Sequence, residues 1–421
     1  MNGFTATFLT ALACSVVLQT WLATRQVAHV QAHRSTVPSE FRDSISLHLH
    51  HKAADYSVAR TKLAIAATGI DAAFLLGWTV GGGLNLLDQA WRAVDLVPLA
   101  TGVGVVASTL LLMALLRLPL LAYHVFVIEE RFAFNRVTLR LFMADAIKKG
   151  LLLVVIGAPL AALALWLMEN AGSLWWLGLW AVWMAFVLAK TWAYPTLVAP
   201  LFNRFVPLRD EALRTRIAGL LERCGLVLDR VFVMDGSRRS THGNAYVTGI
   251  GSSKRVVLLD ALLDALGPEE IEAVLAHEVG HLKRRHIQKY LTAMALASLV
   301  GIMLLGWLAE QTGFYNGLGV ARASPHAAIA LVLLILPVLR VFLKPLASSA
   351  FRRFEFEADA FAADHADPRV LSRALVKLYG ANANTLTPDR LYSAFHHSHP
   401  PPLARVTRLA NAARRVSSLN G

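Results

Sequence analysis

The chain has little cysteine and little charge, and each shortage excludes a class of protein. Its two cysteines are Cys14, in an apolar run, and Cys224, in a polar segment. Two thiols placed so far apart provide neither a disulfide framework nor a thiolate metal site. Charged residues make up 16% of the 421 residues and hydrophobic residues 56%, whereas soluble domains are about a quarter charged. The composition therefore indicates a protein that lies in lipid.

Seven apolar runs are long enough to cross a bilayer, which takes about 20 residues of helix. They cover residues 4–22, 63–87, 98–122, 150–168, 174–197, 291–309 and 327–349. No Lys or Arg precedes the first run, and it continues past any small-residue cleavage site, so we interpret it as a span and not as a signal peptide. We expect a mainly α, polytopic membrane protein with about seven transmembrane helices.

Acidic residues are also scarce, with 28 Asp and Glu against 41 Lys and Arg and a net charge of +13. The basic residues are distributed unevenly among the loops that join the spans. Arg92 is the only basic residue between spans two and three, none lies between spans four and five, and Arg322 is the only one between spans six and seven. By the positive-inside rule, the amino terminus lies outside and the carboxyl terminus faces the cytoplasm. The charge thus reflects topology, and we expect no nucleic-acid partner.

Two polar regions interrupt the membrane pattern, and the orientation places both on the cytoplasmic side, where they can form one site. No repeat, low-complexity tract or linker separates them as independent domains. We divide the chain into transmembrane helices 1–5 with their loops, a first cytoplasmic-side polar region with strands and a helix, helices 6–7, and a second cytoplasmic-side polar region with carboxyl-terminal helices. These cover residues 1–200, 201–290, 291–349 and 350–421.

Local patterns predict a small β-sheet among helices in these regions. Pro268 is favoured as a first helical residue, and Glu269 and Glu270 complement the positive end of a helix, so a helix should begin there. The tract from His396 to Pro402 should be extended, because three consecutive prolines do not continue a helix. The other predicted elements are helices at 209–224, 350–365 and 369–381, and strands at 230–234, 245–250 and 255–259, the last two joined by a turn at 251–253.

The string HEVGH lies within the helix that begins near Pro268. His277 and His281 are four residues apart, so they project from one face and can bind one ion together. Glu278 lies beside them and can take a proton from water at the metal. Zn²⁺, one per chain, is therefore the predicted cofactor. The alternative is a pair of surface histidines at the end of a membrane helix.

A catalytic zinc takes three protein ligands and one water, so a third ligand must come from elsewhere. His286 would lie on the wrong face of a continuous helix, and Arg284 stands where a metzincin requires glycine. The stretch from Arg352 to Asp359 supplies carboxylates on the correct side of the membrane. Glu355 and Asp359 share a face, so we expect Glu355 as ligand and Asp359 as an acceptor that orients a zinc-bound histidine. Alternatively, these acids pair with neighbouring arginines on a solvated face.

Taken together, these motifs resemble those of the type I CAAX prenyl endopeptidases, polytopic zinc proteases that act on the carboxyl ends of isoprenylated proteins. The resemblance spans most of the chain. It rests on HEVGH, RRFEFEADAFA at 352–362, SRRSTHGNAY at 237–246, KRVVLLDALL at 254–263, YPTLVAPLFNRF at 194–205 and SHPP at 398–401. HEVGH alone is shared by unrelated metalloproteases, whereas the set is specific.

The resemblance implies a fold and further site residues. Seven helices would enclose a chamber that holds the zinc, with Glu355 as its third ligand and Asp359 behind the ligands. The resemblance also implies that His399 and Arg405 assist at the cleaved carbonyl. An edge strand would pair with an extended substrate through Asn244, Ala245 and Tyr246.

The expected function is zinc-dependent hydrolysis of peptide bonds in the membrane, resembling removal of the last three residues of prenylated CAAX proteins. An alternative is a bacterial quality-control protease for membrane proteins that needs no prenyl group. A polytopic transporter or channel with a structural metal site belongs to another class, but the chain shows no paired halves. We expect a peptide or protein substrate, a bilayer partner, and residence in a bacterial inner membrane or endoplasmic reticulum membrane with the site toward the cytoplasm.

Overall fold

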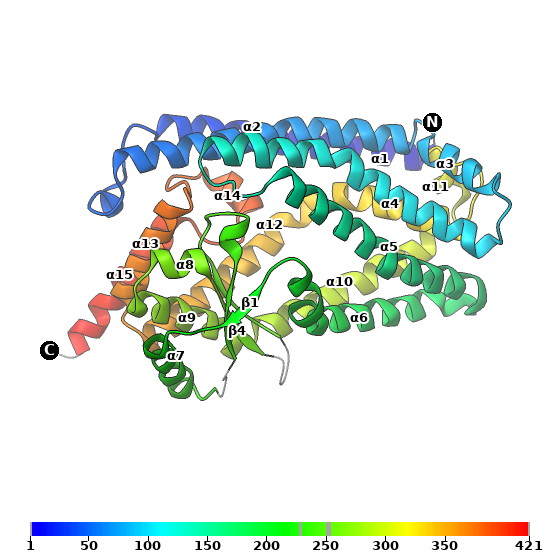
Figure 1. Cartoon of the computed structure of the whole chain (residues 1–421). Helices are drawn as coiled ribbons and strands as arrows, with labels where there is room; N and C mark the ends of the chain where they lie inside the picture. The colour runs from blue at the N-terminus through cyan, green and yellow to red at the C-terminus, as the bar shows by residue number, and fades with distance from the viewer. Residues whose placement is uncertain (1, 227–229, 250–253, 420–421) are drawn as a thin grey trace.

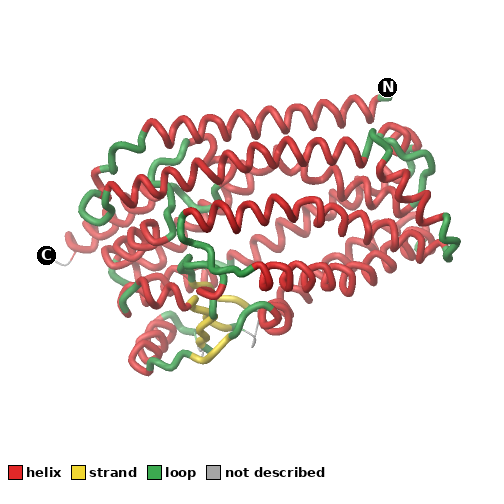
Figure 2. Tube along the Cα trace, turned by 45° about the horizontal axis from the view of Figure 1, so that its top comes forward, coloured by secondary structure: helices red, strands yellow, loops and turns green. Residues whose placement is uncertain are grey.

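Long, roughly parallel helices make up most of the molecule, and a small sheet with shorter helices gathers at one end (Figures 1 and 2). The structure is a computed structural model that describes residues 2–226, 230–249 and 254–419. The carboxyl terminus lies at the end that holds the sheet, and the amino terminus lies at the opposite end (Figure 1). The fold therefore separates a membrane part from a mixed polar part.

The described residues contain seven stretches of helix long and apolar enough to cross a membrane, which confirms the predicted polytopic, mainly α fold. Helices α1 and α2 lie side by side along one edge (Figure 1). A π-turn at His124–Glu129 extends α4, and short turns flank α6. The spanning helices are α1 (Gly3–Ala32), α2 (Leu47–Trp78), α4 (Pro98–Tyr123), α5 (Leu139–Asn170), α6 (Trp175–Ala193), α10 (His286–Ala309) and α12 (Pro325–His365).

The bounds of the second span were predicted wrongly. The apolar run at 63–87 suggested one span, but α2 begins at Leu47 and ends at Trp78, and a separate helix, α3 (Gly83–Arg92), follows. The chain turns sharply at the glycines, because Gly82 adopts φ +79° and a Cβ on Gly81 would lie 2.8 Å from the carbonyl oxygen of Gly77. Hydropathy alone does not locate such a turn, since the residues on both sides are apolar.

The sheet has the strand order β1-β2-β4-β3 among the described residues. Its strands are β1 (Phe205–Pro207), β2 (Val231–Met234), β3 (Ala245–Thr248) and β4 (Arg255–Leu259). β2 and β4 pair in parallel, while β1 pairs with β2, and β3 with β4, in antiparallel fashion. The predicted pairing of the last two strands is confirmed, and the turn predicted between them lies outside the described residues. This arrangement leaves β3 at one edge.

Helix α9 (Pro268–Lys283) begins where the sequence predicted. Pro268 occupies the first turn, and the Glu270 carboxylate accepts a hydrogen bond of 2.9 Å from the Gly267 amide, which satisfies an amide that the helix leaves unpaired. The end of α9 differs from the expected helix through His286. Arg285 adopts a left-handed φ of 56°, and a new helix, α10, begins at His286. The assumption of a continuous helix through His286 was therefore wrong.

Helix α12 runs from the membrane to the polar end as one element of 41 residues. The predicted span at 327–349 and the predicted helix at 350–365 are thus one continuous helix. Five of the remaining helices cover the polar end with the sheet. They are α7 (Glu211–Arg223), α8 (Asp260–Ala265), α13 (Pro368–Ala381), α14 (Arg390–His396) and α15 (Pro402–Leu419). Helix α11 (Thr312–Gly317) lies at the opposite end, against α1 (Figure 1). Side chains from α7, β4, α9 and α13 form a common core there, including Leu220, Leu258, Leu275 and Leu371.

Candidate metal centre and catalytic cavity

Two histidines of α9 and one glutamate of α12 meet at the polar end. The Nε2 atoms of His277 and His281 lie 3.2 Å apart. The Glu355 carboxylate approaches both, with Oε2 3.5 Å from His277 Nε2 and Oε1 3.4 Å from His281 Nε2. Two stretches of chain separated by 73 residues or more thus contribute to one cluster.

The geometry of this cluster fits a tetrahedral metal ion. Ligand bonds of about 2.0–2.1 Å in a tetrahedron separate the ligand atoms by about 3.3 Å. The three observed separations, 3.2, 3.4 and 3.5 Å, are close to that value. Two imidazole nitrogens and a carboxylate oxygen are also a donor set that holds a catalytic metal and leaves the fourth position open.

A buried carboxylate and guanidinium lie behind His277. Asp359 Oδ1 is 2.8 Å from His277 Nδ1, which directs the Nε2 lone pair toward the cluster. Arg405 donates two hydrogen bonds to Asp359, of 2.9 Å from Nε and 2.5 Å from Nη2. Burial acts to lower the pKa of Arg405, but the Asp359 carboxylate raises it, so the guanidinium stays charged. His277, Asp359 and Arg405 therefore form a fixed, buried unit.

A second chain of hydrogen bonds orients His281. Its Nδ1 lies 2.9 Å from Nδ1 of His286, and His286 Nε2 lies 3.1 Å from Glu357 Oε2. His286 reaches this position because the chain breaks at Arg285, whereas a continuous helix would have turned it away. The sequence hypothesis considered His286 only as a ligand and assigned Glu357 no role. Both residues instead support the ring that faces the metal position.

Glu278 lies on α9 beside the ligands and lines the same cavity as His277 and Glu355. Burial raises the pKa of Glu278, while the neighbouring His277 and His281 act in the opposite direction. A carboxyl group with a perturbed pKa in a cavity is typical of functional sites. The position and environment of Glu278 suit a group that accepts and returns a proton.

The metal cluster opens into a cavity of about 770 Å³ that runs from α2 to the polar helices. His399, which the resemblance assigned to the cleaved carbonyl, borders it together with the proline tract. His399 is 68% exposed at its side chain and holds its Nδ1 2.8 Å from Glu355 Oε2. Arg405 lines the cavity as well, and its remaining nitrogen, Nη1, lies 3.6 Å from Glu355 Oε2. The cavity is large enough for several residues of a peptide.

The edge strand β3 begins at this cavity. Asn244 lines the cavity wall, and its carbonyl oxygen accepts a hydrogen bond of 3.0 Å from the Leu259 amide of β4. Because pairing to a neighbour alternates along an antiparallel strand, Ala245 turns its amide and carbonyl away from β4 and Tyr246 turns them toward it. The backbone of Ala245 therefore faces the open edge, although its amide also contacts the Asn244 side chain at 2.9 Å.

Two cavity residues, one in α13 and one directly after it, were missed by the sequence analysis. The Tyr379 hydroxyl is buried in the cavity wall and has no hydrogen-bond partner of good geometry within the described part of the chain. Burial raises the pKa of Tyr379, so the hydroxyl remains a donor. Asn382 exchanges hydrogen bonds of 3.1 and 3.2 Å with the backbone of Gly243 and thereby fixes the entry to β3. No motif indicates either residue, since both depend on the packing of α13 against the site.

Comparisons with known proteins agree with this geometry. Residues 26–204 match the amino-terminal region of the CAAX prenyl proteases, described as five membrane helices, and residues 207–413 match peptidase family M48. The chain is 33% identical over 404 residues to CAAX prenyl protease 1 of Saccharomyces cerevisiae, a match that covers 89% of this chain and 88% of the relative. It is 32% identical over 427 residues to a CAAX prenyl protease 1 homolog of Oryza sativa subsp. japonica, covering 96% and 98%.

A solved structure shares the whole fold. The crystal structure of S. mikatae Ste24p superposes with a TM-score of 0.90 at 29% sequence identity, and the match covers 97% of this chain and 99% of that one. The resemblance predicted from the motifs is therefore confirmed, as are a multi-pass membrane location and hydrolysis of peptide bonds by a metalloprotease. The chain belongs to the CAAX prenyl protease family of M48 membrane metalloendopeptidases.

Proposed function

We propose that the protein is a zinc endopeptidase that cleaves peptide bonds inside a membrane chamber, with its site toward the cytoplasm. The observation that carries the proposal is the cluster of His277, His281 and Glu355. Its imidazole nitrogens lie 3.2 Å apart, and each lies within 3.5 Å of one oxygen of the Glu355 carboxylate, which suits a tetrahedral site with one open position. Two imidazoles and a carboxylate favour zinc among the common ions. Zinc supplies Lewis-acid chemistry that acidifies water and polarises a carbonyl.

Glu278 is the proposed proton carrier. Its carboxylate accepts the proton of the attacking water and then delivers that proton to the leaving amine. The raised pKa of Glu278 through burial favours the first step, because a more basic carboxylate takes the water proton more readily. Asp359 and the pair of His286 and Glu357 keep the two ligand rings in place throughout.

The negative charge that develops on the cleaved carbonyl needs hydrogen-bond donors. His399 and Arg405 are proposed for this role, because both line the cavity beside Glu355 and Arg405 keeps one nitrogen free of Asp359. Tyr379 is a further donor that lines the same cavity. Loss of one such donor commonly lowers the rate by about 100- to 1,000-fold.

The substrate backbone is proposed to extend along β3 at Asn244, Ala245 and Tyr246. The outward amide and carbonyl of Ala245 can pair with a peptide in the manner of an added strand. Such pairing reads the backbone and not the sequence, so the side chains of the cavity must provide selectivity. Arg60 of α2 gives the cavity wall a positive charge, which suits a peptide with a free carboxylate.

Prenylated proteins are the proposed substrates, since the relatives carry the name of CAAX prenyl proteases. The cytoplasmic orientation follows from the basic loops, whose asymmetry predicts that the polar end of Figure 1 faces the cytoplasm. The source membrane, bacterial or endoplasmic reticulum, depends on the organism. Peptides without a prenyl group are the substrates under the quality-control alternative.

A cleavage assay with purified protein tests both parts of the proposal. A farnesylated CAAX peptide and its unprenylated form are compared before and after chelation of the metal. We expect cleavage of the prenylated peptide that chelation and Glu278→Gln abolish, while Glu269→Gln in the first turn of the same helix leaves it unchanged. Equal cleavage of both peptides would support the alternative without a prenyl requirement. Cleavage that survives chelation and Glu278→Gln would refute the mechanism.

A further inference from the structure

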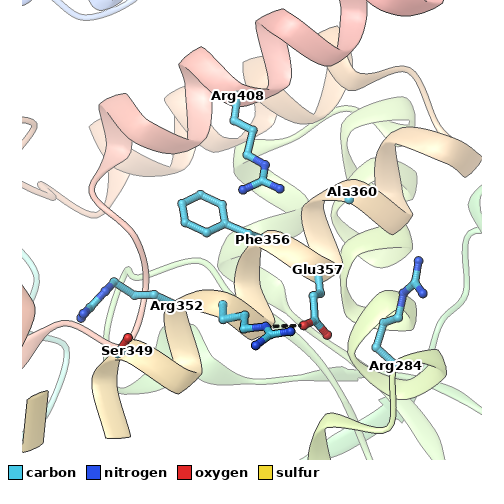
Figure 3. A pocket seen from close by; sticks show the side chains of 8 residues that line it. Arg284, Ser349, Arg352, Phe356, Glu357, Ala360 and Arg408 are labelled. Atoms are coloured by element: carbon cyan, nitrogen blue, oxygen red, sulfur yellow. Dashed lines mark hydrogen bonds and ion pairs between the residues drawn. The ribbon is translucent and has the colours of Figure 1, made fainter. Parts of the chain in front are cut away.

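A second cavity, of about 580 Å³, lies at the polar end of α12 and is separate from the catalytic cavity (Figure 3). Its walls come from the end of α9, from α12 and from α15. Four of its eight lining residues are arginines and one is a glutamate. The lining residues are Arg284, Ser349, Arg352, Arg353, Phe356, Glu357, Ala360 and Arg408, and we call this cavity the arginine pocket.

The single carboxylate of the arginine pocket is already engaged. Glu357 lies 3.1 Å from each of Arg353, Lys289 and His286. Arg352 donates to backbone carbonyls at the end of α14, including that of His397 at 3.0 Å. These contacts leave no spare carboxylate to neutralise the other two arginines of the pocket.

Arg284 and Arg408 have no carboxylate within 4 Å in the described ranges of the chain. Figure 3 shows them reaching from α9 and α15 toward the space beside Phe356, Glu357 and Ala360. The Arg408 guanidinium lies 4.6 Å from the centre of the Phe356 ring. The arginine pocket therefore presents two guanidinium groups that lack an internal counterion, which is the requirement for binding an external anion.

The arginine pocket continues an apolar stripe of α12. Leu339, Phe342 and Leu346 are exposed, Leu346 to 70% of its surface. Steps of three and four residues lead from Phe342 and Leu346 to Ser349, Arg353, Phe356 and Ala360, so all lie along one face of the helix. Arg340 and Lys344 project from a different side. The stripe thus faces lipid in the membrane and ends in the pocket.

The arginine pocket also lies at the level where the membrane ends. Lys289 is in the first turn of the spanning helix α10 and contacts Glu357 in the pocket wall. Tyr290 follows it, is exposed, and packs on Phe351 with ring centres 5.7 Å apart. Tyrosine and lysine at the end of a span mark the boundary between hydrocarbon and headgroups. The pocket is therefore placed beside phospholipid headgroups.

We propose that the arginine pocket binds the phosphate-bearing headgroup of an anionic phospholipid, whose acyl chain lies along Leu346, Phe342 and Leu339. Guanidinium groups recognise phosphate oxygens through paired hydrogen bonds. The proposed orientation places the pocket at the cytoplasmic leaflet, which carries the anionic lipids. The apolar stripe selects a lipid over free phosphate, because it buries a chain that free phosphate lacks.

Lipid retention by the purified full-length protein tests the proposal. The protein is delipidated in neutral detergent and titrated with dioleoyl phosphatidylglycerol or with dioleoyl phosphatidylcholine, which share the same chains, and native mass spectrometry counts the bound lipids. We expect one tight phosphatidylglycerol and no tight phosphatidylcholine. Each arginine near a membrane contributes about a fivefold gain in affinity for anionic lipid, so Arg284→Gln with Arg408→Gln should weaken that binding about thirtyfold.

Matched variants keep the test specific. Arg209→Gln with Arg214→Gln removes the same charge beside and within α7 and should leave the affinity unchanged. Arg284→Lys with Arg408→Lys keeps the charge and should retain most of it. If the variant with Arg284→Gln and Arg408→Gln does not fold, Ala360→Glu replaces it in the test. This substitution places a carboxylate in the pocket from an exposed helical position and should produce the same loss of phosphatidylglycerol affinity.

Three results would overturn the proposal. The first is equal affinity for the two lipids. The second is an equal loss of phosphatidylglycerol affinity in the pocket variants and in the α7 control. The third is displacement of the lipid by inorganic phosphate or glycerol phosphate at equal concentration. The last result would make the pocket a site for soluble phosphate. Activity is not needed as a readout, so the outcome is independent of the proposed protease mechanism.

Discussion

At the scale of single residues, the site depends on two imidazole rings that are each held from behind by a carboxylate. Asp359 contacts His277 directly, at 2.8 Å. Glu357 acts on His281 through His286, over distances of 3.1 and 2.9 Å. Such outer contacts fix the tautomer and the orientation of a ligand ring, and their loss typically weakens metal binding about 10- to 100-fold.

Replacement of His286 tests the longer of these two chains. We expect His286→Ala to weaken zinc affinity about 10- to 100-fold, because the His281 ring loses its partner. His286→Asn should restore part of the affinity, since its amide can still contact His281 Nδ1. Competition with a zinc chelator measures the affinity without an activity assay. Unchanged affinity in His286→Ala would show that the contact does not position His281.

Tyr379 provides a prediction about catalysis. Tyr379→Phe removes only a hydroxyl that lacks a partner of good geometry in the described chain, so the fold should keep its thermal stability. We expect kcat to fall about 100-fold with little change in KM, as for loss of one oxyanion donor. Tyr392→Phe, in the wall of the same cavity, should change kcat little. An unaltered kcat in Tyr379→Phe would remove that hydroxyl from the mechanism.

At the scale of elements, the metal cluster requires that α9 and α12 cross closely. Gly280, the glycine of HEVGH, makes the crossing possible. A Cβ on Gly280 would lie 3.0 Å from the Cα and from the carbonyl oxygen of Ala358, which is tighter than ordinary van der Waals contact, so the α12 backbone would have to shift. The glycine of the motif is therefore a packing requirement as well as a helix position.

Substitution of Gly280 should separate the two helices. We expect Gly280→Ala to weaken zinc affinity and to destabilise the fold by about 1–3 kcal/mol, the usual cost of overpacking, because α12 carries Glu355 away from His277. Gly301→Ala in α10 is the matched control, since no heavy atom lies within 4 Å of its added Cβ. It should leave stability equal or about 1 kcal/mol higher. Equal behaviour of the two variants in chelator competition and thermal unfolding would argue against the close crossing.

Much of the element structure could be predicted from local chemistry, and the failures have a common cause. Pro268 and Glu270 signal the start of α9 through local hydrogen bonding, and a short apolar run rich in valine predicts β4. The break at Arg285 has no such signal, since a left-handed arginine is stabilised only by its surroundings. The same holds for the contacts of His286 and Tyr379, which arise when distant helices pack together.

At the scale of the whole molecule, the site lies at the polar end of a bundle of spanning helices, so water must reach the metal position next to the membrane part. Lipid-facing helices alone would leave polar backbone and side chains unsatisfied. The cavity of about 770 Å³, lined by polar groups from α2, α9, α12 and α13, meets that requirement. Composition and charge predicted the spans. The division of the chain into four segments, at residues 1–200, 201–290, 291–349 and 350–421, stays a prediction.

The orientation of the molecule follows from its loop charges and can be tested by itself. We expect a cysteine introduced at Ser173, between α5 and α6, to react with an impermeant maleimide from outside intact cells or microsomal lumen. A cysteine at Ser418, in the last helix, should react only after the cytoplasmic face is exposed, because the positive-inside rule places it there. Replacement of the native Cys14 and Cys224 by serine provides the background. The reverse pattern of labelling would place the site on the other side.

The central claim is that one ion is bound by two imidazoles of α9 and one carboxylate of α12. Anomalous diffraction at the zinc edge from crystals of the zinc-loaded protein measures this directly. We predict one strong peak at about 2.0–2.2 Å from the Nε2 atoms of His277 and His281 and from one oxygen of Glu355, lost in Glu355→Ala crystals soaked at the same zinc concentration. A peak away from these three side chains, or one that persists unchanged without the Glu355 carboxylate, would contradict the account.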